Sequence, residues 1–167
     1  MFNKKFWIPF FIIGIIGTLM HFIYEWSGEN PVVGLFAPIN ESIWEHQKLL
    51  FFPSIAYSAF SYLKDRKYPN DPISTLFGVI SGMLSIITLY YTYKGIIGKD
   101  IGWLNIVIFY IGVAVFLITK RIIRKNRVLT GITPNIAAII IILILSILFG
   151  IWTYMPPKLG IFTPPMA

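Results

Sequence analysis

Residues 40–48 read Asn-Glu-Ser-Ile-Trp-Glu-His-Gln-Lys and run directly into an apolar segment at residues 49–63. We expect one helix here, spanning about 43–63. Its apolar part has about 15 residues, or roughly 22 Å of helix, whereas a membrane crossing needs about 20 residues. The polar start of the helix, including Glu45 and His46, is therefore predicted to lie at the membrane interface or slightly below it.

The composition favours a membrane protein. The chain has 167 residues, of which 56% are hydrophobic and 13% are charged, and its mean hydropathy is +0.74. A soluble domain carries about 25% charged residues. The net charge of +7 does not indicate a nucleic-acid partner, because the basic residues stand in short runs between apolar segments, as they do in multi-pass proteins. The absence of cysteine excludes disulfides and thiolate metal sites.

The hydropathy pattern predicts an all-α fold, a single membrane domain over residues 1–167. We expect a bundle of five transmembrane helices at about 6–24, 43–63, 73–93, 101–119 and 135–154. The segment at 26–40 is broken by glycine and proline but remains apolar, so we expect it to fold onto the membrane surface or into the mouth of the bundle. The proline-rich tail at 155–167 is predicted to be extended.

The distribution of basic residues predicts the topology. Short basic runs stand at 4–5, 64–67 and 120–127. The positive-inside rule therefore favours a cytoplasmic N-terminus and an extracytoplasmic C-terminus in a multi-pass protein of the cell membrane, surrounded by membrane lipid. We interpret the strongest cluster, 120–127, as a solvated cytoplasmic loop near anionic headgroups rather than a specific lipid site.

The predicted helix at 73–93 carries two patterns. Gly78 and Gly82 form a GxxxG pair that permits close approach of another helix. Hydroxyl side chains recur on one side of the helix, and we favour interhelical hydrogen bonds over a substrate path as their role; they are Ser81, Ser85, Thr88 and Thr92.

The remaining polar residues gather at the ends of the first two helices. His21 and Glu25 are four residues apart, so they share one helix face. Glu41 and Glu45 have the same spacing, and Glu41 also suits the dipole of a helix start. His46 points about 100° away from Glu45. Since the connecting loop is short, we predict that these groups converge below the outer interface, where ionisable side chains are usually functional.

These residue types suggest roles for a metal-assisted enzyme. Two imidazoles and several carboxylates match the ligands of zinc, manganese or iron, although no HExxH motif is present. The tentative metal ligands are His21, His46 and Glu25. The predicted catalytic residues are Glu25, Glu45 and Lys48, and the predicted substrate contacts are Trp26, Asn40, Glu41, Ser42 and Trp44.

Each assignment has a structural alternative. Ser42 and Glu45 fit a capping box, in which the carboxylate returns to the serine amide. Glu25 is equally suited to an ion pair with Lys48 in water. For His21, the alternative to a functional role is a structural hydrogen bond to a neighbouring helix.

Three functional classes follow from this cluster. The first is a metal-assisted enzyme acting on a lipidic or amphipathic substrate. The second is a small transporter or substrate-binding subunit that uses the carboxylates and His21 as a cation or proton site. The third is a structural bundle, or a subunit that associates with a partner membrane chain. No internal repeat supports an inverted-repeat transporter.

Three stretches of the sequence resemble a known family. Glu25-Trp26-Ser27-Gly28, the run at 33–48 and the Tyr-Met-Pro-Pro segment at 154–157 are similar to the signature EWSG…NES-x-WEH-x-K and the C-terminal end of a family of small uncharacterised bacterial multi-pass membrane proteins, a domain of unknown function. The resemblance implies a multi-pass membrane fold and no particular activity.

Overall fold

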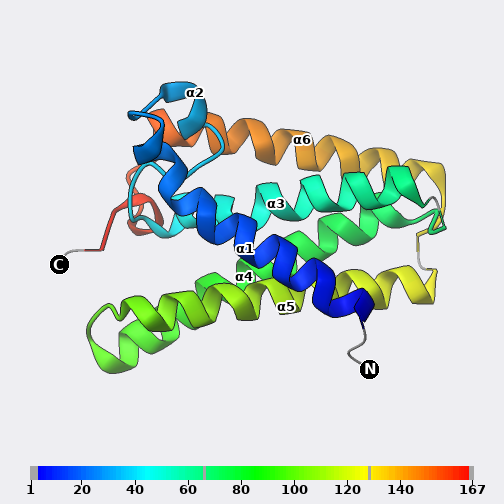
Figure 1. Ribbon diagram of the computed structural model, residues 1–167, viewed down its shortest axis with the longest axis horizontal. Coiled ribbons are helices and arrows are strands. Elements are labelled where there is room, and N and C mark those ends of the chain that lie inside the picture. The colour runs from blue at the N-terminus through cyan, green and yellow to red at the C-terminus, as the bar shows by residue number, and fades with distance from the viewer. Residues whose placement is uncertain (1–3, 66, 128, 166–167) are drawn as a thin grey trace.

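A computed structural model describes residues 4–65, 67–127 and 129–165. Within these residues the chain is all-helical. Its elements in chain order are α1 (Lys4–Trp26), α2 (Pro31–Gly34), α3 (Ile43–Lys64), α4 (Asp71–Ile97), α5 (Gly102–Asn126), α6 (Ile132–Tyr154) and the 3-10 helix η1 (Gly160–Phe162). Figure 1 shows the five long helices side by side along the long axis, with α2 and the C-terminal segment at one end and the start of α1 at the other.

Four of the long helices, α1, α4, α5 and α6, are long and apolar enough to cross a membrane by length and composition. α3 is not among them, and its first turns carry Glu45, His46 and Lys48. α3 instead lies inside the bundle, in contact with α1, α4, α5 and α6. The fold is that of a membrane helix bundle, and protein rather than lipid surrounds much of the helix that is short of apolar residues.

The ends of α4 and α5 differ from the predicted spans. α4 covers 71–97 instead of 73–93, and α5 covers 102–126 instead of 101–119. Most of the basic cluster therefore belongs to the last turns of α5, so its interpretation as a solvated loop was wrong. The reason is a long-range ion pair: Lys120 is 4% exposed and its ammonium lies 3.4 Å from the Asp71 carboxylate, which Arg124 also contacts.

The segment between α1 and α3 packs over one end of the bundle. Its α2 turn begins at Asn30, whose side chain accepts a hydrogen bond from the Val32 amide at 2.9 Å. The Tyr154 hydroxyl donates to the Pro31 carbonyl at 2.6 Å, which ties the segment to the end of α6.

The C-terminal segment was predicted to be extended, but it contains η1 and returns to α3. The Phe162 ring lies 5.0 Å from Trp44 and 5.5 Å from Trp152, measured between ring centroids. Aromatic burial therefore holds this end of the chain against the bundle. Residues 166–167 of the predicted tail, and residue 66 of the predicted basic run, lie outside the described residues.

The predicted GxxxG pair lies where α4 packs against α5. A Cβ atom on Gly82 would be 2.8 Å from the Gly112 carbonyl oxygen, and one on Gly78 would be 2.9 Å from the Phe116 carbonyl oxygen. The two backbones approach this closely because neither glycine has a side chain. Of the four hydroxyl residues, Ser81 and Ser85 donate to carbonyls of their own helix at 2.7 Å rather than to a neighbouring helix.

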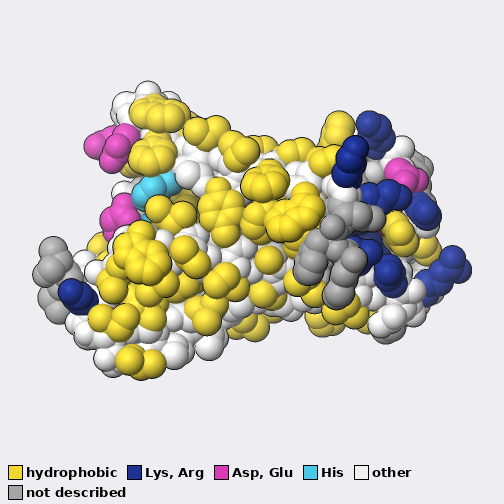
Figure 2. Space-filling model, turned by 60° about the horizontal axis from the view of Figure 1, so that its bottom comes forward, with side chains coloured by type: hydrophobic (Ala, Val, Ile, Leu, Met, Phe, Trp, Pro, Cys, Tyr) yellow, Lys and Arg dark blue, Asp and Glu magenta, His cyan; other side chains and the backbone are white. Residues whose placement is uncertain are grey.

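Charge divides the surface into two ends. Figure 2 shows a hydrophobic middle, lysine and arginine gathered at one end, and acidic and histidine side chains at the other. We call these the basic end, which carries Lys4, Lys5, Lys67, Arg121, Arg124 and Lys125, and the histidine end, which carries His21, Glu25, Glu41 and His46. An apolar belt between two polar ends is the pattern expected of a bilayer-spanning bundle.

The close contact of α4 with α5 predicts the effect of a single methyl group. Gly82→Ala should lower the free energy of unfolding by about 1–3 kcal/mol, because the added carbon meets backbone that cannot retreat. Gly95→Ala is the matched control in the same helix, since a methyl group added there would meet nothing within 4 Å. Thermal unfolding in detergent measures both variants, and equal stability of the two would contradict this packing.

Candidate functional site

The Lys48 side chain anchors the loop that precedes α3. Its ammonium is fully buried and donates to the Gly34 carbonyl at 2.7 Å, to Glu45 Oε2 at 2.7 Å and to Thr153 Oγ1 at 2.6 Å, with the Ala37 carbonyl at 3.3 Å. Glu45 Oε2 also accepts the Ile39 amide at 3.0 Å. We call this network, made by Glu45, Lys48, Thr153 and the loop backbone, the loop anchor.

The loop anchor revises two of the structural alternatives. Ser42 does cap α3, with its hydroxyl accepting the Glu45 amide at 3.3 Å. The Glu45 carboxylate does not return to Ser42 but binds Lys48 and the loop, so the capping box is only half formed. The predicted ion pair between Glu25 and Lys48 is wrong. Glu25 is exposed, and Lys48 is buried and paired with Glu45 in the loop anchor.

Breaking the buried ion pair should be costly. Lys48→Met leaves the Glu45 carboxylate buried, 2% exposed, without its cation, and we expect a loss of about 3–5 kcal/mol in the free energy of unfolding. The double variant Lys48→Met/Glu45→Gln should lose less, because no uncompensated charge remains. Chemical or thermal unfolding in detergent tests this order, and a double variant less stable than the single one would contradict it.

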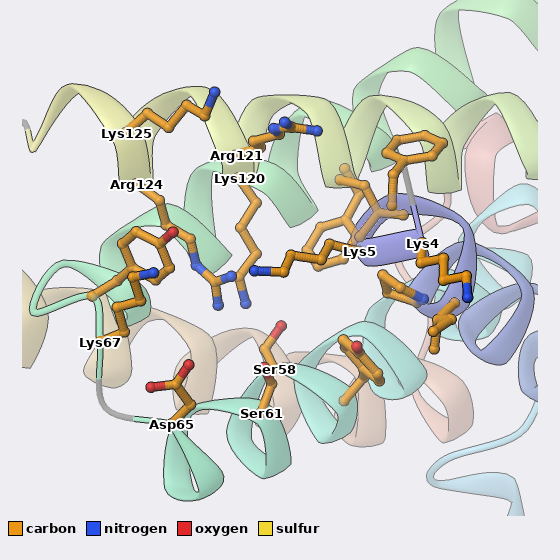
Figure 3. Close-up of a pocket in the computed structure, with 17 residues that line it drawn as sticks. Lys4, Lys5, Ser58, Ser61, Asp65, Lys67, Lys120, Arg121, Arg124 and Lys125 are labelled. Atoms are coloured by element: carbon orange, nitrogen blue, oxygen red, sulfur yellow. The ribbon is translucent and has the colours of Figure 1, made fainter. Parts of the chain in front are cut away.

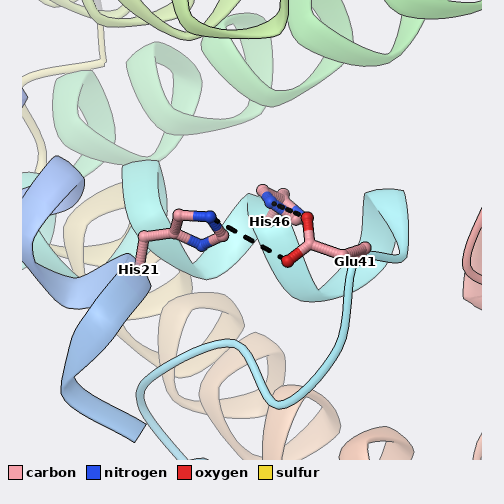
Figure 4. Close-up of side chains that lie close together, drawn as sticks. All are labelled: His21, Glu41 and His46. Atoms are coloured by element: carbon pink, nitrogen blue, oxygen red, sulfur yellow. Dashed lines mark ion pairs between the residues drawn. The ribbon is translucent and has the colours of Figure 1, made fainter. Parts of the chain in front are cut away.

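A second group, His21, Glu41 and His46, forms the histidine cluster. The Glu41 carboxylate lies between the imidazoles, with Oε2 at 3.3 Å from His46 Nε2 and Oε1 at 3.9 Å from His21 Nε2. The ring centroids of the two histidines are 5.1 Å apart. Among the described residues, these three offer ligand atoms that all lie within 4.8 Å of one another. Figure 4 shows the two rings, from α1 and α3, and the carboxylate, from the loop, turned toward a common space.

The hydrogen bonds of His46 fix which nitrogen faces Glu41. His46 Nδ1 lies 2.9 Å from the Ser42 carbonyl oxygen. A carbonyl only accepts, so Nδ1 carries the proton, and Nε2 is left facing the carboxylate. Two acceptors at 3.3 Å repel each other unless a proton or another cation lies between them. His21 is also incompletely satisfied, because its buried Nδ1 has no hydrogen-bond partner in the described part of the chain.

Glu41 is the exposed member of the histidine cluster, with 66% of its side chain accessible. The hydrogen bond with His46 lowers the pKa of the Glu41 carboxyl below its usual value of 4.5, and the charges of His46 and His21 add to this, against the opposing effect of partial burial. Glu41 is therefore ionised at neutral pH. Glu41 lies beside both imidazoles, whereas Glu25 is exposed in the last turn of α1, and the ligand role of Glu25 stays a prediction.

The other predicted substrate contacts do not lie together in one place. Trp26 is 69% exposed at the end of α1, and its ring stacks on Phe22. Asn40 accepts the Ser42 amide at 2.9 Å, so both residues shape the start of α3. Trp44 faces α6, with its ring centroid 4.6 Å from that of Phe149.

A cavity of about 300 Å³ adjoins the histidine cluster. Its polar lining comes from Glu41 and His46 and from Tyr90, Asp100 and Asn105. The rest of its lining is apolar: Ile43, Leu49, Ile86, Ile108, Phe109 and Pro165. The cavity therefore joins two polar groups across an apolar surface, which is the usual form of a small-molecule site.

The sequence reasoning missed the second polar group. Asp100 accepts from the Tyr90 hydroxyl at 2.7 Å and from the Asn105 amide at 2.7 Å. The signal for it was the scarcity of acids, since the chain has seven aspartates and glutamates in all. Asp100 falls between the predicted helices at 73–93 and 101–119, and helix spacing alone does not show that side chains of α4 and α5 meet there.

The contact of Glu41 with His46 predicts a measurable titration. His46→Phe removes the hydrogen bond, so the pKa of Glu41 should rise back toward 4.5. The stabilisation from this contact is present above that usual value and is lost as the pH falls through the lowered pKa. Carbon-13 NMR of the labelled Glu41 carboxyl measures the change. An unchanged Glu41 titration would contradict the contact.

The fold and the site together define a class. Four apolar helices long enough to span a bilayer, packed with a central helix whose polar start is buried, make this a multi-pass helical membrane protein. The chain belongs to the DUF6512 family, a family of unknown function, whose model matches residues 1–167. The family agrees with the kind of resemblance found in the sequence, and the signature motif itself stays a prediction.

Curated relatives are distant. The chain is 27% identical over 157 residues to "Heme A synthase" of Ehrlichia ruminantium (strain Gardel), which covers 85% of this chain and 43% of the relative. It is 25% identical over 130 residues to "Heme A synthase" of Ehrlichia canis (strain Jake), which covers 72% of this chain and 35% of the relative. The chain thus spans less than half the length of these relatives. No solved structure matches it.

Proposed function

We propose that this chain is a five-span protein of the cell membrane whose histidine end lies outside the cytoplasm and holds a divalent metal for a reaction on a lipidic or amphipathic substrate. The observation that carries the proposal is the histidine cluster: two imidazoles and one carboxylate converge, with the anchored ring of His46 facing Glu41. The five-span count requires α3 to cross with its polar start at the interface, and the loop anchor supports this by neutralising Lys48.

The residues fit a divalent metal. Two histidines and one carboxylate are a common protein ligand set for zinc, and also for iron and manganese. Zinc–nitrogen distances of about 2.0–2.1 Å require ligand atoms to lie about 3.3 Å apart in a tetrahedral site. Glu41 Oε2 lies at this separation from His46 Nε2, at 3.3 Å, and one ligand atom from each of the three residues lies within 4.8 Å of the others. The His46 Nδ1–H donating to Ser42 is the backing hydrogen bond that orients most metal-binding histidines.

The adjoining cavity supports a substrate with an apolar part. Its aliphatic and aromatic wall, between Ile43 and Phe109, would bury a hydrocarbon segment. Glu41 and His46 would hold the polar group of the substrate at one side. Asp100, oriented by Tyr90 and Asn105, would accept or donate a proton at the other. A metal at the histidine cluster would supply Lewis-acid activation of water or of a carbonyl group.

A second candidate is cation binding without chemistry, as in a small transporter or a substrate-binding subunit that works with a partner membrane chain. The exposure of Glu41 favours it, because a ligand at the surface lets an ion exchange with solution. The likeness to proteins named heme A synthase suggests another occupant, a heme, for the two histidines. The following measurement separates these possibilities.

Metal analysis tests the proposal. Protein purified in detergent should retain about one zinc, iron or manganese ion per chain, measured by plasma mass spectrometry. His21→Ala and His46→Ala should each weaken binding at least about a hundredfold, because a three-ligand site loses one ligand. Hydrolysis of ester lipids in reconstituted vesicles should fall in the same variants.

Glu25→Gln is the matched control, since Glu25 is a carboxylate at the same end of α1 but outside the histidine cluster. It should bind metal as the wild type does. A metal-free wild type, or equal loss in Glu25→Gln, would overturn the metal site. Metal binding with no reaction on any lipid would favour cation transport, and a heme absorption spectrum lost in the histidine variants would favour heme.

A further inference from the structure

The basic end contains a larger cavity, of about 580 Å³, formed where the start of α1, the second half of α3 and the end of α5 meet. Cationic side chains dominate its lining: Lys4, Lys5, Lys67, Lys120, Arg121, Arg124 and Lys125. Among the described residues that line it, Asp65 is the one carboxylate. Figure 3 shows Lys5, Lys120 and Arg124 extending from two helices toward the same space, opposite Ser58 and Ser61 of α3.

The wall of this cavity carries more basic than acidic side chains. Seven basic side chains and one carboxylate line it, and like charges that are held near one another repel. Asp71 offsets part of the charge of Lys120 and Arg124. These ion pairs also hold both side chains in position, so the cavity is preformed. An anion with several oxygens would relieve the remaining repulsion.

An independent observation points to the same ligand. Ser58 is 3% exposed and lines the cavity, and its hydroxyl has no hydrogen-bond partner in the described part of the chain. Buried hydroxyls are nearly always hydrogen-bonded, so each exception requires an explanation. A ligand oxygen in the cavity would accept from Ser58, and Ser61 lies one turn further along the same wall.

Another part of the wall is apolar. Phe6 and Ile8 come from α1, and Phe116 and Leu117 come from α5. Ile8 is 54% exposed on the outer surface of the bundle, where the hydrophobic belt begins. A ligand that places an anionic group among the cations can therefore place a hydrocarbon segment along this apolar edge.

We propose that the cavity at the basic end binds a phosphate group, with Lys5, Lys120, Arg124 and Ser58 as its contacts. Two sources of this group share the same chemistry, namely the headgroup of an anionic phospholipid and a soluble phosphate. The site lies at the opposite end from the histidine cluster, so it does not depend on the metal. It differs from the nonspecific headgroup contact expected of a basic loop, because the charges surround a cavity with a buried hydroxyl.

The test measures binding to the full chain in neutral detergent. The probes are dioctanoyl phosphatidic acid, dioctanoyl phosphatidylcholine and inorganic pyrophosphate. Phosphatidic acid should bind, and Lys5→Gln and Ser58→Ala should each weaken it about tenfold, the value of one charge-assisted hydrogen bond. Lys64→Gln is the matched control, because Lys64 is an exposed lysine of the same end that does not line the cavity. It should change binding less than about twofold.

The outcomes are distinct. Phosphatidic acid bound much more tightly than pyrophosphate identifies a lipid source, and the reverse identifies a soluble phosphate; both support the site. Equal binding of phosphatidic acid and phosphatidylcholine would overturn it, as would equal weakening by Lys64→Gln and Lys5→Gln. Ser58→Ala separates binding from folding, because removing an unpaired hydroxyl should not lower the melting temperature. A Ser58→Ala variant that binds phosphatidic acid like the wild type would also overturn the assignment.

Discussion

The structure at the histidine end depends on the burial of one ammonium group. The Lys48 ammonium is fully buried, and a buried charge is tolerated only when it is paired and hydrogen-bonded. Glu45 supplies the opposite charge, and the carbonyls of the preceding loop supply the remaining acceptors. The loop must therefore bend over the start of α3, and that bend is what brings Glu41 between the imidazoles of α1 and α3. The polar residues that shorten the apolar part of α3 are therefore the same residues that hold the preceding loop in place.

Much of the fold followed from hydropathy and spacing. The long helices and their order were predictable, because runs of about 20 apolar residues have few alternatives. The meeting of His21 with His46 was predictable too, since a short loop joins their helices. The position of Glu41 beside both imidazoles, with Glu25 outside the histidine cluster, was not. Spacing of four residues places side chains on a helix face, but Glu41 precedes α3, and its direction is set by the loop.

Long-range polar pairs were the other failure of sequence reasoning. Lys120 was expected in water, and it is buried because Asp71, 49 residues away in the chain, meets it across the packed backbones of α4 and α5. Asp100 is likewise held by partners from two helices. In each case the sequence shows the charged residue, but nothing near it in the chain indicates which distant residue it contacts. α3 connects the histidine cluster with the cavity at the basic end. It carries His46 near its start, and its Ser58 lines that cavity.

The mixed origin of the three groups in the histidine cluster has a kinetic consequence. Two of them stand on packed helices, whose positions change only when the bundle itself rearranges. The third, Glu41, stands on a loop and points largely into solvent. Rotation of this one side chain takes nanoseconds or less, far faster than a shift of helices. An occupant of the cluster would thus lose its contact with Glu41 whenever that side chain rotates away, and it would keep its contacts with the two histidines on the packed helices.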